Sequence, residues 1–126
     1  MVEPSYLLDT NICLYAILAL GEPLRQRISV QDEGALAIST ITLAELGVGQ
    51  RSRPEQEKQF ARFLGALQVL PFDEFAARRF ADLPFRRGSF GRLIAAHALA
   101  TGLTLVTNNE HDFADIPDLK FENWTL

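Results

Sequence analysis

The sequence contains very little cysteine. Cys13 is the only cysteine in 126 residues, so the chain cannot form an internal disulfide. This excludes the small secreted proteins that depend on disulfide frameworks, and a lone thiol is typical of a reducing compartment. We interpret Cys13 as a small, buried apolar residue.

Long hydrophobic runs are also missing. The longest uninterrupted apolar run covers residues 12–20 and ends at Gly21-Glu22-Pro23, whereas a membrane-spanning helix needs about 18 or more such residues. Glu3 places an acid where a secretory signal would carry positive charge. These features predict a cytoplasmic protein that does not engage a membrane.

Positive charge is the third scarce property. The chain has 12 Lys and Arg residues against 16 Asp and Glu residues, a formal net charge of -4, which argues against a broad phosphate-binding surface. A length of 126 residues with 48% hydrophobic residues is typical of one compact domain. We therefore expect a single domain over residues 1–126.

The sequence does contain an alternation of short apolar segments and amphipathic segments. The apolar segments predict strands at 6–8, 36–38, 68–71, 103–107 and, at a sheet edge, 120–122. The amphipathic segments predict helices at roughly 11–19, 23–33, 40–48, 55–66, 74–86 and 90–100. Asn11, Ser39 or Thr40, Asp73 and Ser89 are the predicted helix caps. The residues predicted to face inward from the helix after Asp73 are Phe75, Ala76, Phe80 and Leu83.

Strands that alternate with helices predict an α/β fold. Parallel neighbours need crossover connections, so we expect a mostly parallel sheet of four or five strands between two helical layers, a three-layer α/β/α sandwich. In such sheets ligands bind beyond the carboxyl ends of the strands. The residues at those ends are therefore the candidates for a functional site.

Acidic and amide side chains follow three of the predicted strands. Asp9 ends the first strand, Glu45 lies one turn into the helix after the second, and Asn109 and Asp112 follow the fourth. Taken singly, each also fits a helix cap, an exposed helical residue or a solvated turn. Together, several carboxylates at one crevice favour a bound Mg²⁺ or Mn²⁺, which prefers oxygen ligands. Such an ion supports hydrolysis of phosphodiesters.

A set of motifs resembles one known family. The stretches are 7–11 (Leu-Leu-Asp-Thr-Asn), 38–46 (Ile-Ser-Thr-Ile-Thr-Leu-Ala-Glu-Leu), 93–98 (Leu-Ile-Ala-Ala-His-Ala), 103–113 and 121–124 (Phe-Glu-Asn-Trp). In order and spacing, over nearly the whole chain, they resemble the PIN-domain ribonucleases of VapC type, the toxins of bacterial type II toxin-antitoxin systems. Asp-Thr-Asn alone would be a weak signal, but the set is specific.

The resemblance implies a PIN-like fold and a Mg²⁺- or Mn²⁺-dependent endoribonuclease that cuts tRNA or rRNA. It also implies inhibition by a cognate VapB-type antitoxin and a homodimeric state. By position, Asp9 and Glu45 match the family's first two metal-site acids. Asn109 stands where many members have Asp, and Asp112 is the nearest acid that could complete that corner. Thr107 would be a polar group at the edge of the site, and Asn11 would steady the Asp9 loop.

One position departs from the family pattern. An acid usually stands two residues before Leu-Ile-Ala-Ala-His-Ala, and this chain has Gly91 there. Glycine inside a helix costs about 0.5–1 kcal/mol relative to alanine, and the first helical turn favours an acid by about 0.3–1 kcal/mol. We hypothesise that Gly91 replaces a metal-binding Asp, naturally or by engineering, and impairs the site. A glycine at a frayed helix start is the alternative.

Two further function classes compete with the nuclease. One is a PIN-like module that binds RNA or antitoxin without cleaving. The other is a phospho-acceptor domain, which would need a lysine beside the acids at the end of the last strand, whereas Lys120 stands at its beginning.

The remaining conspicuous side chains have structural interpretations. We expect His97 in the core and Trp124 as an anchor of the tail. We also expect the phenylalanines to be mostly core, with part of that set able to form a groove for a partner helix.

Charge is unevenly distributed along the chain. Residues 1–50 carry 2 basic and 6 acidic groups, residues 51–92 carry 9 and 5, and residues 93–126 carry 1 and 5. The acids thus gather in the segments with the metal-site candidates. The middle segment could supply a phosphate-binding rim, or simply a solvated face, through Arg51, Arg53, Arg62, Arg78, Arg79, Arg86, Arg87 and Arg92.

Overall fold

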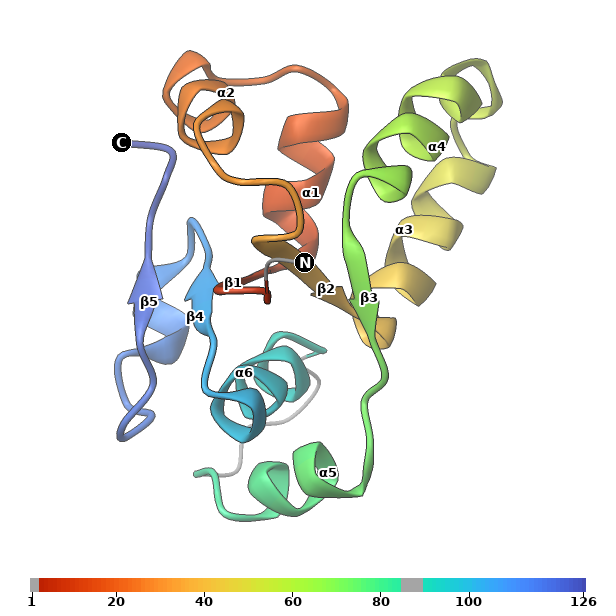
Figure 1. Cartoon of the computed structure of the whole chain (residues 1–126). Helices are drawn as coiled ribbons and strands as arrows, with labels where there is room; N and C mark the ends of the chain where they lie inside the picture. Colours follow the sequence, from red (N-terminus) through yellow and green to blue (C-terminus); the bar gives the residue numbers. More distant parts are fainter. Residues whose placement is uncertain (1–2, 85–89) are drawn as a thin grey trace.

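The sheet has five strands, all parallel. A computed structural model describes residues 3–84 and 90–126 of the chain, and Figure 1 shows how its elements are arranged. The strands are β1 (Tyr6–Leu8), β2 (Leu36–Ser39), β3 (Gln68–Leu70), β4 (Thr104–Val106) and β5 (Phe121–Glu122). Their order across the sheet is β3-β2-β1-β4-β5, and each of the four pairings is parallel. All five predicted strands are present, and the last one lies at an edge of the sheet, as predicted.

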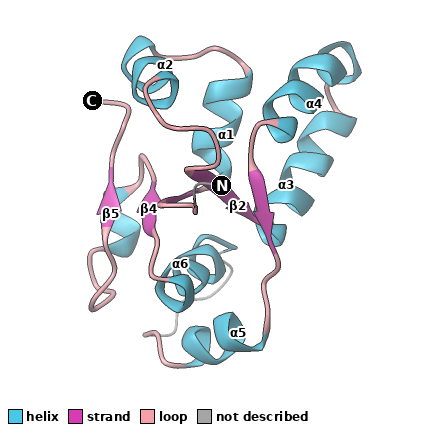
Figure 2. Ribbon diagram, viewed as in Figure 1, coloured by secondary structure: helices cyan, strands magenta, loops and turns pink. Residues whose placement is uncertain are grey.

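Helices cover both faces of this sheet. They are α1 (Thr10–Ile17), α2 (Glu22–Ser29), α3 (Thr40–Arg51), α4 (Glu57–Gly65), α5 (Glu74–Ala81) and α6 (Phe90–Thr101), with 3₁₀ turns η1 (Pro54–Gln56) and η2 (Glu110–Phe113). Figures 1 and 2 show α1 to α4 on one side of the sheet and α5 and α6 on the other. The three-layer α/β/α sandwich predicted from the sequence is confirmed.

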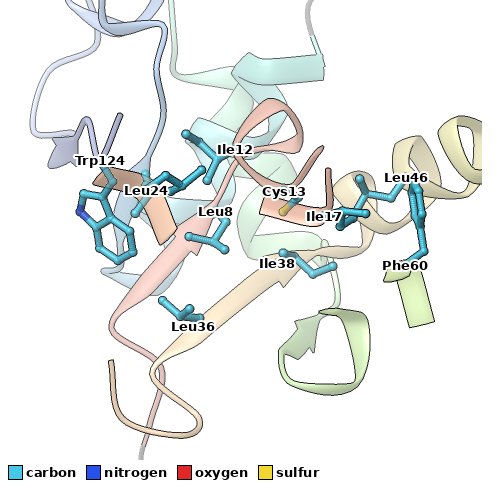
Figure 3. Close-up of a cluster of buried hydrophobic side chains, with 11 residues drawn as sticks. Leu8, Ile12, Cys13, Ile17, Leu24, Leu36, Ile38, Leu46, Phe60 and Trp124 are labelled. Carbon is cyan, nitrogen blue, oxygen red and sulfur yellow. The ribbon is translucent and has the colours of Figure 1, made fainter. Parts of the chain in front are cut away.

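Each face of the sheet has its own hydrophobic cluster. Leu8 and Ile38 point from the strands toward Ile12, Cys13 and Ile17 of α1 (Figure 3). On the opposite face the cluster joins the sheet to α6 and to the segment after β4, through Leu7, Ala37, Ile94, Ala95, Ala98, Leu105, Phe113 and Ile116. Alternate strand residues serve opposite faces, as the two-residue period of a strand requires. Cys13 is fully buried, as predicted, and burial raises the pKa of its thiol well above the ordinary value.

Trp124 anchors the C-terminal segment, as predicted. Its side chain is fully buried and packs edge-on against Tyr6, with ring centroids 4.9 Å apart. The Arg27 guanidinium lies 5.0 Å from the indole centroid, and the indole Nε1 donates a hydrogen bond to Glu122 at 2.9 Å. These contacts hold the tail against the first strand and α2.

Helix α5 is shorter than the sequence pattern predicts. The predicted end near residues 85 and 86 is wrong, because the helix ends at Ala81. Pro84 disfavours helical geometry in the residue before it, so the chain turns after Ala81. The inward position of Phe75 is also wrong, since its side chain is 72% exposed while Ala76 is fully buried. Neighbouring residues differ by about 100° around a helix, so both cannot face the core.

The predicted cap of α1 is wrong by two residues. Asp9 is the cap, because its Oδ1 accepts a hydrogen bond from the Ile12 amide at 2.9 Å, and Asn11 lies exposed within the first turn. Ser39 and Asp73 cap α3 and α5 as predicted. Ser89, the predicted cap of α6, lies outside the described residues.

Candidate functional site

The predicted site residues lie together at one edge of the sheet. A cleft of about 180 Å³ opens beyond the carboxyl ends of β1, β2 and β4. It is lined by Asp9, Thr10, Asn11, Glu45, Gly91, Ile94, Asn109, Asp112 and Phe113. Three carboxylates therefore reach one cleft from three separate parts of the chain. Gly91, the residue that departs from the family pattern, also lines this cleft.

Asp9 is the most constrained of these acids. Its residue is only 7% exposed, and its carboxylate accepts hydrogen bonds from the Ile12 amide at 2.9 Å and from the Thr107 hydroxyl. Burial nevertheless raises the pKa of Asp9 above its ordinary value, and the negative charge of Glu45 adds to this, while the two hydrogen bonds oppose it. A buried acid with a raised pKa in a cleft is typical of a functional site.

Thr107 connects two of the site segments. Its side chain is fully buried, it donates to Asp9, and its Oγ1 accepts a hydrogen bond from the Asn109 amide at 3.0 Å. Thr107 lies behind the cleft and not among its lining residues. It thus fixes the end of β4 relative to the end of β1.

Glu45 is positioned by a residue that sequence reasoning missed. The hydroxyl of Thr10 donates a hydrogen bond to Glu45 Oε1 at 2.6 Å and lies 3.3 Å from Thr42 Oγ1. Thr10 therefore links the start of α1 to α3 across the cleft. Thr10 belongs to the Asp-Thr-Asn motif, but nothing in the sequence indicates which of α1's neighbours its hydroxyl would meet.

Asp112 and Asn109 form one corner of the cleft. The Asn109 side-chain amide donates a hydrogen bond to Asp112 Oδ2 across η2, so the two residues share one turn, as predicted. The main chain at Asp112 is held from behind by Arg92, whose Nη1 donates to the Asp112 carbonyl at 3.0 Å.

This role of Arg92 corrects the prediction that it belongs to a phosphate-binding rim. Arg92 is 2% exposed, and its guanidinium also bonds Asp115 at 3.2 and 3.3 Å and the Pro84 carbonyl at 2.9 Å. A phosphate cannot reach it. Arg86 and Arg87 lie outside the described residues, and the rim formed by the remaining arginines stays a prediction.

The donor set of the cleft fits a hydrated divalent cation. The described lining residues include three carboxylates and the side-chain amides of Asn11 and Asn109, and none is Lys or Arg. Within residues 3–84 and 90–126 no group of three or more His, Cys, Asp or Glu side chains lies close enough together to hold a metal ion by itself. Mg²⁺ is usually bound by one or two carboxylates and keeps several of its waters. Asp9, Glu45 and Asp112 suit that mode of binding.

His97 is a core residue, as predicted. It is 1% exposed and packs edge-on against Phe72, with ring centroids 5.5 Å apart. Burial lowers the pKa of His97, although Asp73 opposes the shift. Its imidazole is therefore held neutral inside the molecule and does not line the cleft.

The burial of Asp9 predicts a pH-dependent stability. Because the pKa of Asp9 is higher in the folded chain than the ordinary 3.8, the folded state binds the proton more tightly. Stability therefore falls as the pH rises from about 3.8 through the raised value. We expect Asp9→Asn, which keeps the cap, to raise the urea midpoint at pH 7 in EDTA-containing buffer, with the difference from the parent shrinking toward pH 4. Parallel pH profiles of parent and variant would contradict this.

Comparison with known proteins identifies the family. A model of the PIN domain matches residues 6–119. The chain is 32% identical to the tRNA(fMet)-specific endonuclease VapC of Shigella flexneri, over 96% of this chain and 98% of that protein. It is 36% identical to Ribonuclease VapC2 of Rickettsia felis, over 94% and 97%.

Solved structures give the same result. The chain superimposes with a TM-score of 0.83 and 32% identity on VapBC2 from Rickettsia felis bound to a promoter DNA fragment, covering 94% of this chain and 98% of that one. DNA-bound VapBC from Salmonella typhimurium matches with the same score and identity over 96% and 98%. The domain model spans most of the sequence and the relatives match over nearly their whole length. The chain therefore belongs to the VapC family of PIN-domain proteins.

Proposed function

We propose that this protein is a VapC-type toxin, a Mg²⁺- or Mn²⁺-dependent endoribonuclease that hydrolyses phosphodiester bonds in tRNA or rRNA. The observation that carries the proposal is the convergence of Asp9, Glu45 and Asp112 on one cleft without a neighbouring Lys or Arg among the described lining residues. A group of carboxylates of this kind favours a bound cation, because their charges repel one another. The names of the relatives support RNA as the substrate.

The roles of the side chains follow from their contacts. Asp9, Glu45 and Asp112 would hold the ion, with Asn109 as a further oxygen ligand. When bound, the ion would polarise a phosphoryl oxygen and lower the pKa of a water. The Ile12 amide and the Thr107 hydroxyl fix the orientation of the Asp9 carboxylate. Thr10 does the same for Glu45. Asn11 lines the cleft beside Asp9, where we propose that it supports the loop.

Gly91 bears on whether this chain cleaves at all. It lies in the wall of the cleft at the position where the family pattern has an acid, so we propose that the metal site is impaired. This observation favours a second candidate function, a non-catalytic module that still binds RNA or antitoxin. The two functions differ in one respect that can be measured, namely whether a restored acid brings back hydrolysis.

We further propose that the partner is a VapB-type antitoxin, since the solved relatives named above are VapBC complexes. An apolar cleft of about 230 Å³ lies between α1, α2 and α4, and Tyr15, Leu20, Leu24, Ile28 and Phe63 are among the residues that line it. Phe63 belongs to the set of phenylalanines that we expect to be able to form a groove for a partner helix, and we propose that this cleft binds an apolar segment of the antitoxin. A homodimer in the cytoplasm remains our expectation. Within the described residues, no helix combines the length and apolar character that crossing a membrane requires.

The direct test is cleavage of a tRNA transcript by the Gly91→Asp form. We expect cleavage in the presence of Mg²⁺, none with EDTA, and none when Glu45→Gln is added to the same background. Glu45→Gln keeps an acceptor for the Thr10 hydroxyl and removes only the charge, so its fold should be preserved. Cleavage that persists in EDTA, or that survives Glu45→Gln, would contradict the metal-dependent mechanism.

A further inference from the structure

A second, larger cavity adjoins the metal-site cleft. It has a volume of about 600 Å³ and lies at the edge of the sheet, where its lining residues come from the segment that follows β4, from β5 and from the segment that follows β5. Its lining residues are Asn108, Asn109, Glu110, His111, Ala114, Phe121, Asn123 and Leu126. Asn109 lines both cavities, so a ligand that fills one can extend directly into the other.

The chemistry of this cavity is unusual for this chain. The sequence has four asparagines, and three of them, Asn108, Asn109 and Asn123, line this one cavity. An amide side chain offers two donors and an acceptor, which is the pattern that reads the edge of a nucleic-acid base. The half-buried ring of Phe121 adds an aromatic surface, of the kind on which unpaired bases stack.

The hydrogen bonds already present determine which side-chain amide groups of the cavity are available to a ligand. The side-chain oxygen of Asn123 accepts from the Thr125 amide at 2.9 Å and from the Thr125 hydroxyl, so its NH₂ group remains as a donor. Within the described part of the chain, the side chain of Asn108 makes no hydrogen bond. Asn109 is engaged with Asp112 on the side of the metal cleft. Asn108 and Asn123 are thus the amides available to a ligand.

The charge of the cavity favours a base over a phosphate as its ligand. Glu110 is exposed, and none of the described lining residues is Lys or Arg. A phosphate would meet the carboxylate of Glu110 with no Lys or Arg to offset it, and His111 is the one basic side chain in the described lining, so a phosphate is disfavoured. A carboxylate instead accepts hydrogen bonds from exocyclic amino groups such as the N4 amine of cytosine. The cavity therefore suits a neutral base that carries an amino group, and uracil lacks one.

We infer that this cavity is the binding subsite for an unpaired RNA base next to the scissile phosphate, with preference for adenine, cytosine or guanine over uracil. The inference rests on the proposed ribonuclease function and adds the part of the substrate that the enzyme recognises. In this arrangement a nucleotide places its phosphate at the metal-site cleft and its base in the neighbouring cavity. Asn108 and Asn123 bind the base edge, Glu110 accepts from the amino group, and Phe121 offers a stacking face.

The first experiment uses the ¹⁵N-labelled chain as it stands, in EDTA, with AMP, CMP, GMP, UMP and ribose 5-phosphate as probes. We expect AMP, CMP and GMP to shift the side-chain amide signals of Asn108 and Asn123, and UMP to do so more weakly. Ribose 5-phosphate should leave them unchanged. The side-chain amide of Gln59, an exposed residue of α4 that lines neither cavity, is the internal control. Equal shifts with ribose 5-phosphate, or no shift at Asn108 and Asn123 with any nucleotide, would overturn the inference.

The second experiment uses variants and needs no cleavage. Binding of a short RNA of alternating cytidine and adenosine is measured by fluorescence anisotropy, with oligouridine of equal length as the comparison. We expect Asn108→Ala to weaken binding of the first RNA by about fivefold or more and Glu110→Gln to reduce the discrimination between the two RNAs. Gln59→Ala, at an exposed position on α4, is the matched control.

The outcomes distinguish a failure of the base subsite from a failure of the ribonuclease function. If the parent binds RNA and the Gly91→Asp form cleaves it, but Asn108→Ala and Glu110→Gln behave like Gln59→Ala, the base subsite is wrong and the ribonuclease function stands. If the Gly91→Asp form neither binds nor cleaves RNA, the function itself fails, and the base subsite fails with it.

Discussion

Replacing Arg92 with alanine should lower the free energy of unfolding by about 3 kcal/mol, because it removes the donor that satisfies two main-chain carbonyls together with the buried arginine of an ion pair. The Arg92 side chain is 3% exposed and lies 3.2 Å from the Asp115 carboxylate. It also satisfies two main-chain carbonyls, those of Pro84 and Asp112. At this size the loss corresponds to roughly 10 °C in the melting temperature. Urea denaturation and calorimetry measure both quantities.

Two controls make the Arg92 result specific. Arg25→Ala removes an arginine of an exposed ion pair, with side chains 70% and 58% exposed, and should leave the melting temperature almost unchanged because water screens the pair. Arg92→Lys keeps the charge but cannot form the same bidentate fork with Asp115, so it should recover only part of the loss. A melting temperature of Arg92→Ala equal to that of Arg25→Ala would contradict the buried network.

Replacing Gly91 with aspartate should raise the rate of Mg²⁺-dependent RNA cleavage by at least about 100-fold, since even groups that only orient a metal ligand contribute about 10–100-fold. The physical reason is that Gly91 shares one cleft with Asp9, Glu45 and Asp112. It is also the second residue of α6, where the helix terminus favours a carboxylate. Calorimetric titration should show Mn²⁺ binding at least about tenfold tighter than in the parent.

The matched controls for Gly91 are alanine and asparagine. Gly91→Ala improves helix propensity by about 0.5–1 kcal/mol but adds no ligand, so we expect higher stability without cleavage. Gly91→Asn adds a side chain of the same shape as aspartate without its charge, and should restore little. Cleavage by the parent chain at the rate of the Gly91→Asp form would show that Gly91 does not impair the site.

The sequence predicted the acids of the candidate site better than it predicted the residues that hold those acids in place. Asp9, Glu45 and Asp112 follow strands or begin helices, and the rule that parallel strands end at one edge brings such residues together. The partners of those acids were not predictable in the same way. Thr10 meets Glu45 across 35 positions of the chain, and hydroxyl groups occur so widely that no pattern distinguishes such a pair.

The errors arose where a local pattern competed with packing. Asn11 and Asp9 are both good helix caps, and the start of α1 immediately after β1 selects Asp9. The sequence pattern placed both Phe75 and Ala76 inward, whereas the packing of α5 against α6 leaves Ala76 buried and Phe75 exposed. Arg92 looked like one more member of a basic cluster, whereas the fold places it inside, among three acceptors.

The sequence by itself determined the layered α/β fold and indicated the acids that line the candidate cleft, because both depend on short-range patterns along the chain. Apolar periodicity specifies strand or helix, and strand ends specify the functional edge. Only the tertiary structure decided what holds each acid, which arginine is buried, and that three asparagines surround one cavity beside the metal-site cleft. Those properties depend on contacts between segments far apart in the sequence, and the packing of the whole chain sets such contacts.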